Sequence, residues 1–409
     1  MQLIQAALEY LISLLVAGSF LATLTKELGF SDSLTGILSS VISLGCIFQM
    51  LSVFVRRKQV KGFVILMSVA NQLLFMMLYV IPVFPVSGKA KTVFFVIFIF
   101  SAYLIYNFAH PKKINWLMSL VDDHHRGSFT ANKEIISLLA GMIFSWGMGV
   151  LVDYFTDRGE MRTAFVLSAM VIFLLMILHT LTMVLTPEPV ISESHGCNIL
   201  ESMKAVLSNK NVIHVTVLFI LYYIATYVSV PFYGTYLINE LGFGLKFVSL
   251  LSIIMSVVRI CISRMWGAYA DKTSFTNMIQ KCLMILGLGY LSVTFAVPVN
   301  GSYMFILYYI FYGIALGGIN SALINLVFDY VPFEKRADSL AICQAASGLC
   351  GFLATLASSV LVSYIQAKGN YFLGLQVYAQ QVVSAIALVI VILALLYIRL
   401  VFKRKHIDG

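Results

Sequence analysis

The sequence contains few charged residues for its length. Only 11% of its 409 residues are Asp, Glu, Lys or Arg, whereas soluble chains carry about 25%. Apolar residues make up 60% of the chain, and the mean hydropathy is +0.93. Apolar runs of about 20 residues, enough to cross a bilayer, recur from end to end. These runs are continuous and do not alternate as they do in a β-barrel. We therefore predict an all-α, polytopic membrane protein.

Other features are also missing, and their absence excludes further classes. The six cysteines fall mostly inside apolar runs without paired spacing, so we expect neither disulfides nor a metal site. There is no G-x-x-x-x-G-K-[ST] loop for ATP and no H-E-x-x-H metal motif. No basic region precedes the first apolar run, so no cleavable signal peptide is expected. We expect no cofactor, and the net charge of +9 fits basic loops beside a membrane and not a nucleic-acid partner.

Twelve predicted spans account for the apolar runs. If the N-terminus is inside, the lysines and arginines gather on the cytoplasmic side, as the positive-inside rule requires. We therefore expect both termini in the cytoplasm, a bacterial inner membrane as the location, and a monomer in the lipid bilayer. The spans, each to within several residues, are 4–26, 32–54, 62–83, 92–120, 130–152, 163–185, 213–236, 246–268, 278–298, 302–330, 338–363 and 374–400.

Two seven-residue stretches nearly repeat one another. "LTKELGF" stands at 24–30 and "LINELGF" at 237–243. The match continues at polar and glycine positions, which coincide by chance less readily than apolar ones. We infer two copies of one long unit, each with six spans, so that the copies are parallel and hold a substrate between them. The further matching pairs are Asn115 and Asn325, Arg126 and Arg336, Ser137 and Ser347, and Gly141 and Gly351.

The duplication divides the chain into three parts. Residues 1–185 are predicted to form one six-helix bundle and residues 213–409 a second. The polar stretch 186–212 between them is expected to be a cytoplasmic linker. Within it, "NILESMKAVL" (198–207) places its apolar residues on one helical face and predicts a short amphipathic helix. We assign Gly141 and Gly351 to close helix packing.

Two loop sequences resemble signatures of the major facilitator superfamily. "RMWGAYADK" (264–272) is similar to the family's G-x-x-A-D-K/R loop, which follows an arginine. "DYVPFEKRADS" (329–339) is similar to its D-x-x-P-x-x-x-R loop, and "SLVDDHHRGS" (119–128) is a weaker copy. The resemblance covers the whole chain and implies twelve transmembrane helices in two parallel six-helix repeats. It also implies a cytoplasmic gate at Asp271, Lys272, Arg264, Arg126, Asp329 and Arg336.

The chain departs from the family pattern in two places. "LSVFVRRKQVKG" (51–62) has no aspartate to correspond to Asp271, so the resemblance implies a latch on one side only. "GMIFSWGMG" (141–149) lacks the proline of drug/proton antiporters, so the sequence favours the alternative of a multidrug efflux pump less.

Ionisable residues inside the predicted spans are the strongest site candidates. A charge at bilayer depth costs roughly 2.5–3.5 kcal/mol, so it seldom lacks a role, although a purely structural ion pair is the alternative. For proton coupling we favour Glu134 over Glu9. Glu134 lies on a polar stripe of its predicted helix, and the residue at the same position in the second copy is Gln344, which does not titrate. The predicted substrate-binding residues are Arg259, His110, Lys113, Asn107, Tyr223, Tyr227, Tyr309, Tyr312, Asn320 and Gln344.

These residues and the resemblance predict a secondary active transporter that works by alternating access as a proton symporter. Arg259 keeps its charge at any working pH and needs an anion. Because the predicted bases outnumber the acids facing them, we expect a small organic anion or acidic sugar as the substrate. A neutral sugar or nucleoside-like solute is the alternative, with Arg259 paired to Glu134. A membrane-embedded enzyme, for which "DDHH" (122–125) is the only hint of a metal, and a channel or receptor fit the duplication less well.

Overall fold

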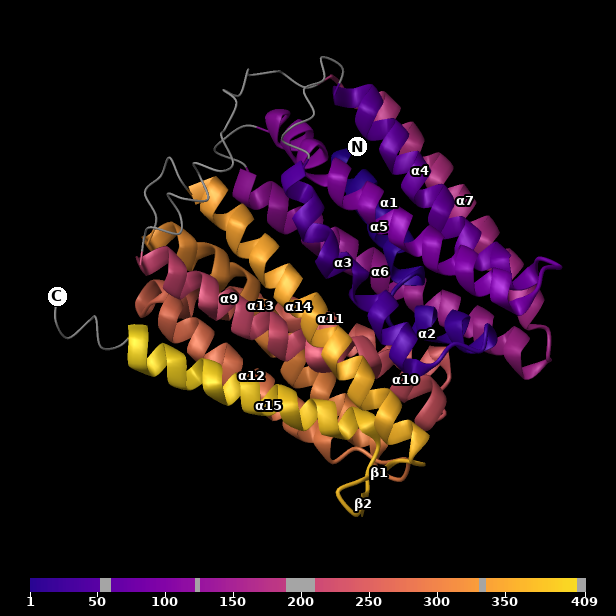
Figure 1. Cartoon of the computed structure of the whole chain (residues 1–409). Coiled ribbons are helices and arrows are strands. Elements are labelled where there is room, and N and C mark those ends of the chain that lie inside the picture. Colours follow the sequence, from indigo (N-terminus) through magenta and orange to yellow (C-terminus); the bar gives the residue numbers. More distant parts are fainter. Residues whose placement is uncertain (52–59, 122–125, 189–209, 331–335, 403–409) are drawn as a thin grey trace. The chain divides into compact units, whose positions relative to one another are not determined.

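The computed structural model describes residues 1–51, 60–121, 126–188, 210–330 and 336–402, and almost all of them are helical (Figure 1). The predicted amphipathic helix at 198–207 and the "DDHH" stretch at 122–125 lie outside these residues. The chain forms two compact units. The first is Met1–Ser194 with Leu237–Leu250, and the second is His195–Tyr236 with Leu251–Gly409.

In the first unit, α4 is central and packs against α5 and α7, while α1 packs against α6 and α7, and α3 against α5. A single turn, Ile81–Val83, follows α4. The helices are α1 (Gln2–Leu15), α2 (Gly18–Glu27), α3 (Asp32–Leu51), α4 (Val60–Val80), α5 (Gly88–Ser119), α6 (Arg126–Asp157) and α7 (Met161–Leu185).

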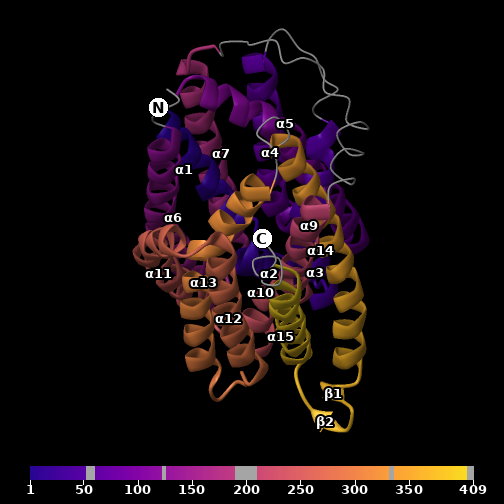
Figure 2. The same ribbon diagram turned by 90° about the vertical axis from the view of Figure 1, so that its left-hand side faces the viewer.

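In the second unit, α12 packs against α13 and α15, and α9 packs against α14 and α15 (Figure 2). The helices are α9 (Lys210–Ser229), α10 (Tyr233–Thr235), α11 (Leu245–Lys272, of which residues 245–250 belong to the first unit), α12 (Phe275–Thr294), α13 (Gly301–Tyr330), α14 (Arg336–Ala367) and α15 (Ala379–Tyr397). Helical turns at Val230–Phe232, Tyr236–Glu240 and Ile398–Phe402 extend α9, α10 and α15. The two-residue strands β1 (Tyr371–Phe372) and β2 (Leu375–Gln376) pair antiparallel between α14 and α15.

The structure confirms an all-α polytopic membrane protein. Eleven helical segments of the described chain are long and apolar enough to cross a membrane. The predicted span 278–298 corresponds to α12, which is not one of the eleven. Its first turns carry Asn277, Gln280 and Lys281, which shortens its apolar stretch. Large apolar side chains such as Ile143 and Val360, 77% and 70% exposed, fit a surface that faces lipid.

The repeated "ELGF" motif ends a helix in both copies. Gly29 and Gly242 have positive φ angles of 71° and 68°, the left-handed conformation that glycine adopts without steric cost. The amide of the next residue then bonds back to the helix. Phe30 N donates to Thr25 O at 3.0 Å, and Phe243 N donates to Leu237 O at 2.8 Å. The repeated motif therefore terminates a helix in the same way in both copies.

The glycine pair assigned to close packing is confirmed. A Cβ on Gly141 would lie 2.5 Å from the ring of Tyr10, and one on Gly351 would lie 2.9 Å from the ring of Tyr227. In each copy, therefore, a tyrosine of the first helix packs onto a glycine of the fifth. The contact brings α1 against α6 and α9 against α14.

The first predicted span is broken in its middle. Helix α1 ends at Leu15 and α2 begins at Gly18, whose φ is +53°. A break inside the membrane leaves backbone carbonyls that need donors. The hydroxyl of Tyr79 donates to Leu15 O at 2.5 Å, and that of Tyr103 donates to Val16 O at 3.4 Å. The two tyrosines thus hold the break against α4 and α5.

Candidate functional site

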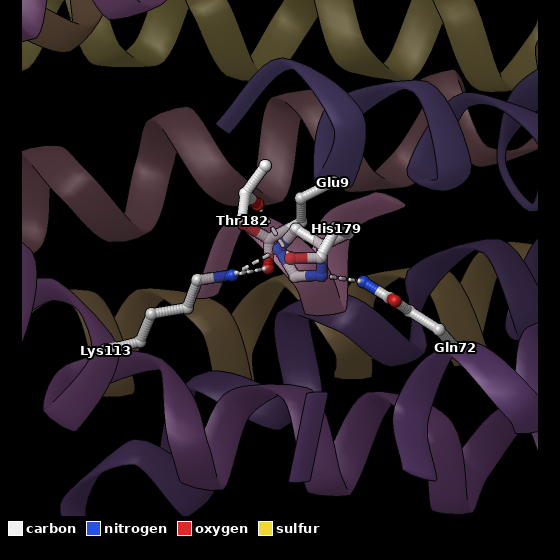
Figure 3. Close-up of polar contacts among 5 residues, drawn as sticks. All are labelled: Glu9, Gln72, Lys113, His179 and Thr182. Carbon is white, nitrogen blue, oxygen red and sulfur yellow. Dashed lines mark hydrogen bonds and ion pairs between the residues drawn. The ribbon is translucent and has the colours of Figure 1, made fainter. Parts of the chain in front are cut away.

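A buried ion pair lies inside the first unit. Lys113 Nζ on α5 is 2.8 Å from Glu9 Oε1 on α1 (Figure 3). The side chain of Lys113 is only 5% exposed, whereas that of Glu9 is 26% exposed. Both were predicted as functional residues, and the structure brings them together. Lys113 therefore has an anionic partner within the protein.

The ion pair extends into a histidine and a glutamine. His179 on α7 is fully buried, and its Nε2 lies 3.2 Å from Lys113 Nζ. Its Nδ1 lies 2.8 Å from the amide group of Gln72 on α4. One turn further along α7, the Thr182 hydroxyl donates to the His179 carbonyl at 2.7 Å. We call Glu9, Lys113, His179 and Gln72 the charged network (Figure 3).

Sequence reasoning missed two members of this network. Neither His179 nor Gln72 was among the site residues that the sequence predicted. The available signal was that both are polar residues in the middle of long apolar spans, 163–185 and 62–83. Such residues are buried against other polar groups because lipid offers them no partner.

A small polar cavity adjoins the ion pair. Its volume is about 10 Å³, roughly the space that one water needs. His110 stacks near Tyr106 with ring centroids 5.1 Å apart, and its buried Nδ1 has no hydrogen-bond partner in the described chain. The predicted His110 therefore lies beside Glu9 and Lys113. The lining residues are Glu9, Met67, Ser68, Asn71, Tyr106, Ala109, His110 and Lys113.

Two other predicted residues of the first unit lie elsewhere. Asn107 is 1% exposed, accepts from Gln49 Nε2 at 2.8 Å and donates to Tyr103 O at 2.9 Å. A Cβ on Gly45 would come within 2.0 Å of its amide nitrogen, so Asn107 is held tightly between α3 and α5. Glu134 is exposed on α6.

In the second unit, tyrosines from α9 and α13 gather. Tyr223 and Tyr227 stack with centroids 5.8 Å apart. Tyr308 stacks on Tyr312 at 5.2 Å and meets Tyr309 edge-on at 5.3 Å. Apart from the fully buried Tyr308, these rings are half-buried. They form one aromatic pair on α9 and one aromatic group on α13, and we call the two together the tyrosine face.

A positive charge adjoins the tyrosine face. Arg259, half-buried on α11, interacts electrostatically with Tyr312. Gln344 on α14 is half-buried and Asn320 on α13 is exposed. The predicted substrate residues thus fall into two groups, one in each unit.

The predicted gate residues lie at helix ends. Arg264, Asp271 and Lys272 are exposed in the last turns of α11, and Asp329 is exposed near the end of α13. Arg126 and Arg336 begin α6 and α14. The structure does not describe the side chains of these two arginines.

The charged network and the tyrosine face offer different chemical groups. In the described part of the chain, His, Cys, Asp and Glu form no group of three or more suited to a metal ion. The charged network couples one carboxylate, one amine and one imidazole, with Lys113 and His179 buried. The tyrosine face offers ring surfaces and hydroxyl groups, which suit a small polar solute.

Comparison with known proteins agrees with this picture. The chain matches the family model of the Major Facilitator Superfamily over residues 3–355 and again over 215–407. A comparison with curated protein sequences finds no significant match.

Among solved structures, the chain resembles the nucleoside transporter NupG with a TM-score of 0.72, at 15% identity and over 98% of each chain. It resembles a D-xylose–proton symporter with a TM-score of 0.68, at 15% identity, over 97% of this chain and 95% of that one. A bacterial homolog of the human lysosomal transporter Spinster gives a TM-score of 0.68 at 12% identity, over 97% and 94% of the two chains. At these identities the likeness shows the fold alone.

Proposed function

Because this chain belongs to the major facilitator superfamily, we propose that it is a proton-coupled secondary transporter of a small hydroxylated solute. The observation that carries the proposal is the buried pair of Glu9 and Lys113 beside a water-sized polar cavity. Ionisable groups at bilayer depth are costly, and in transporters they mark ion pathways. A binding site that alternates between the two sides of the membrane supplies the transport step.

The pair has the chemistry that coupling needs. With Glu9 ionised, the opposite charges of Glu9 and Lys113 attract each other. A proton on Glu9 removes that attraction and leaves the Lys113 ammonium buried without an anion. The two protonation states therefore stabilise different arrangements of α1 and α5, and a proton can shift the conformational equilibrium by that difference.

Glu9 is the better supported of the two coupling candidates. Sequence reasoning favoured Glu134, because its repeat mate does not titrate. The structure gives Glu9 a buried cationic partner, whereas Glu134 is exposed. Glu134 stays the alternative proton carrier.

The tyrosine face favours a solute with a ring and hydroxyl groups, such as a sugar or a nucleoside. Rings stack on tyrosines, and hydroxyl groups exchange hydrogen bonds with theirs. The sequence favoured an anionic substrate because the predicted bases outnumber the acids. That argument is weaker now, because Lys113 already has Glu9 as its anionic partner. An acidic sugar is the second candidate, and Arg259 beside Tyr312 is the observation that favours it.

Uptake into proteoliposomes tests the coupling. We would measure labelled pentose, nucleoside and hexuronate, each with an inward proton gradient and after its collapse by a protonophore. We expect accumulation of one class that the protonophore abolishes. Glu9→Gln should lose accumulation but retain exchange of solute across the membrane. Normal accumulation in Glu9→Gln together with its loss in the matched Glu134→Gln would assign coupling to Glu134 instead.

The same assay separates the two substrate classes. Arg259→Lys keeps the charge but loses the two-pronged hydrogen bonding of the guanidinium to a carboxylate. If the substrate is an acidic sugar, this variant should weaken uptake strongly. Uptake of a neutral solute that survives Arg259→Gln would exclude the acidic sugar. If neither wild-type protein nor variants accumulate any solute class, the transport proposal fails.

A further inference from the structure

We propose that His179 is a second acceptor for the Lys113 ammonium and that it thereby sets how readily Glu9 takes up a proton. This inference rests on the proposed coupling through Glu9. His179 does not touch the solute in this scheme, and it acts by positioning Lys113. Lys113 Nζ lies within reach of both partners, at 2.8 Å from Glu9 Oε1 and 3.2 Å from His179 Nε2.

The hydrogen-bond partners define the protonation of His179. An ammonium group only donates, so His179 Nε2 must accept, and the ring is neutral with its proton on Nδ1. Nδ1–H then needs an acceptor from Gln72. Amide oxygen and nitrogen are assigned by their partners, and exchanging them in Gln72 places its oxygen on Nδ1–H. After the exchange the Gln72 oxygen has a donor, and its NH2 group takes the buried position that has no partner in the described chain.

His179 matters most when Glu9 is protonated. A neutral carboxylic acid no longer attracts Lys113, whose buried side chain then needs another acceptor. His179 Nε2 is in place to accept, and Gln72 holds the ring in the tautomer that can do so. When Glu9 is ionised, the lysine already has a stronger partner. Removing His179 therefore costs the protonated state more than the ionised state.

Few other groups can produce the same effect. The other titratable groups near this region are Tyr103, Tyr106 and His110 from α5, Cys46 from α3, and Lys133 from α6, which acts on His110. Helix α4 contributes only the uncharged Ser68, Asn71 and Gln72. None of these groups has a described hydrogen bond to Lys113, whereas His179 Nε2 lies 3.2 Å from Lys113 Nζ and can accept from it.

Infrared difference spectroscopy tests the inference without a known substrate. The purified protein is titrated with acid, and the C=O stretching band of a protonated carboxyl group is followed. The part of the band that disappears in Glu9→Gln belongs to Glu9. In His179→Leu we expect the midpoint of this band to move about one pH unit toward acid, a tenfold lower proton affinity. His179→Gln keeps an acceptor and should stay near the wild-type midpoint.

Several results would overturn the proposal. An unchanged midpoint in His179→Leu excludes His179 as the second acceptor, and so does an equal shift in His179→Gln. A wild-type spectrum without any Glu9 band, over the pH range in which the protein stays folded, also contradicts it. If His179→Leu does not fold, Gln72→Leu replaces it and should shift the midpoint in the same direction but less. Failure of proton-driven uptake would instead refute the coupling proposal, because this titration needs no transport.

Discussion

Glu9 and Lys113 can be held within candidate membrane-spanning helices because each neutralises the other. Breaking a buried pair by removing one partner leaves an uncompensated charge and costs about 3–5 kcal/mol. We therefore expect Glu9→Gln and Lys113→Met to lower the thermal unfolding midpoint in detergent, each by several degrees. The double variant Glu9→Gln/Lys113→Met should recover most of that loss, because it leaves no buried charge.

The double variant also separates stability from function. If the pair only stabilises the fold, the double variant should transport normally. On the coupling proposal it folds but does not accumulate solute. Equal instability in the double and single variants would show that the two charges do not depend on each other.

Sequence reasoning found the residues of this site but not their pairing. Glu9, His110 and Lys113 stood out because ionisable residues are rare in apolar spans. Which acid meets which base depends on the rotation and depth of separate helices, and periodicity along one helix does not define these. His179 was missed for the same reason, since only the approach of α7 to α5 makes it a partner of Lys113.

At the scale of elements, the break between α1 and α2 depends on donors from neighbouring helices. Tyr79 is 2% exposed, and its hydroxyl satisfies the carbonyl of Leu15. Tyr79→Phe should cost about 1–3 kcal/mol, because a buried carbonyl loses its donor while the ring still packs. The thermal unfolding midpoint measures the effect, with Tyr154→Phe as the control at an exposed tyrosine. Equal midpoints in the two variants would mean that another group satisfies Leu15.

Element boundaries were predictable where local chemistry decides them. The "ELGF" motif marked two helix ends, and both carry a glycine with positive φ. The break at 15–18 was not predicted, because "LLVAGS" reads as a continuous apolar span and the tyrosines that support the break come from α4 and α5. The predicted ninth span is present as α12, and it is less apolar than the other spans because polar residues occupy its first turns.

At the scale of the whole molecule, one helix belongs to both compact units. Residues 245–250 of α11 fall in the first unit and the remainder of α11 in the second. The first turn of α11 is bound by Asp153 of α6. Its carboxylate accepts from Leu245 N at 2.8 Å and from Lys246 N at 2.7 Å. These amides have no partner within their own helix, and a negative charge at a helix N-terminus is stabilising.

Removing this carboxylate should loosen the start of α11. A lost helix cap costs about 1 kcal/mol, so Asp153→Ala should speed hydrogen exchange of the first-turn amides roughly fivefold. Asp157→Ala, at an exposed acid one turn along α6, is the matched control. In the alternating-access cycle that we propose, the two units move during transport, so a helix that both share should affect the rate of the cycle. We expect Asp153→Ala to change the maximal uptake rate while the half-saturating solute concentration stays close to wild type. Slow amide exchange and an unchanged rate in Asp153→Ala would show that other contacts, such as the bond from Ser249 Oγ to Ser145 O at 2.9 Å, hold the helix start by themselves.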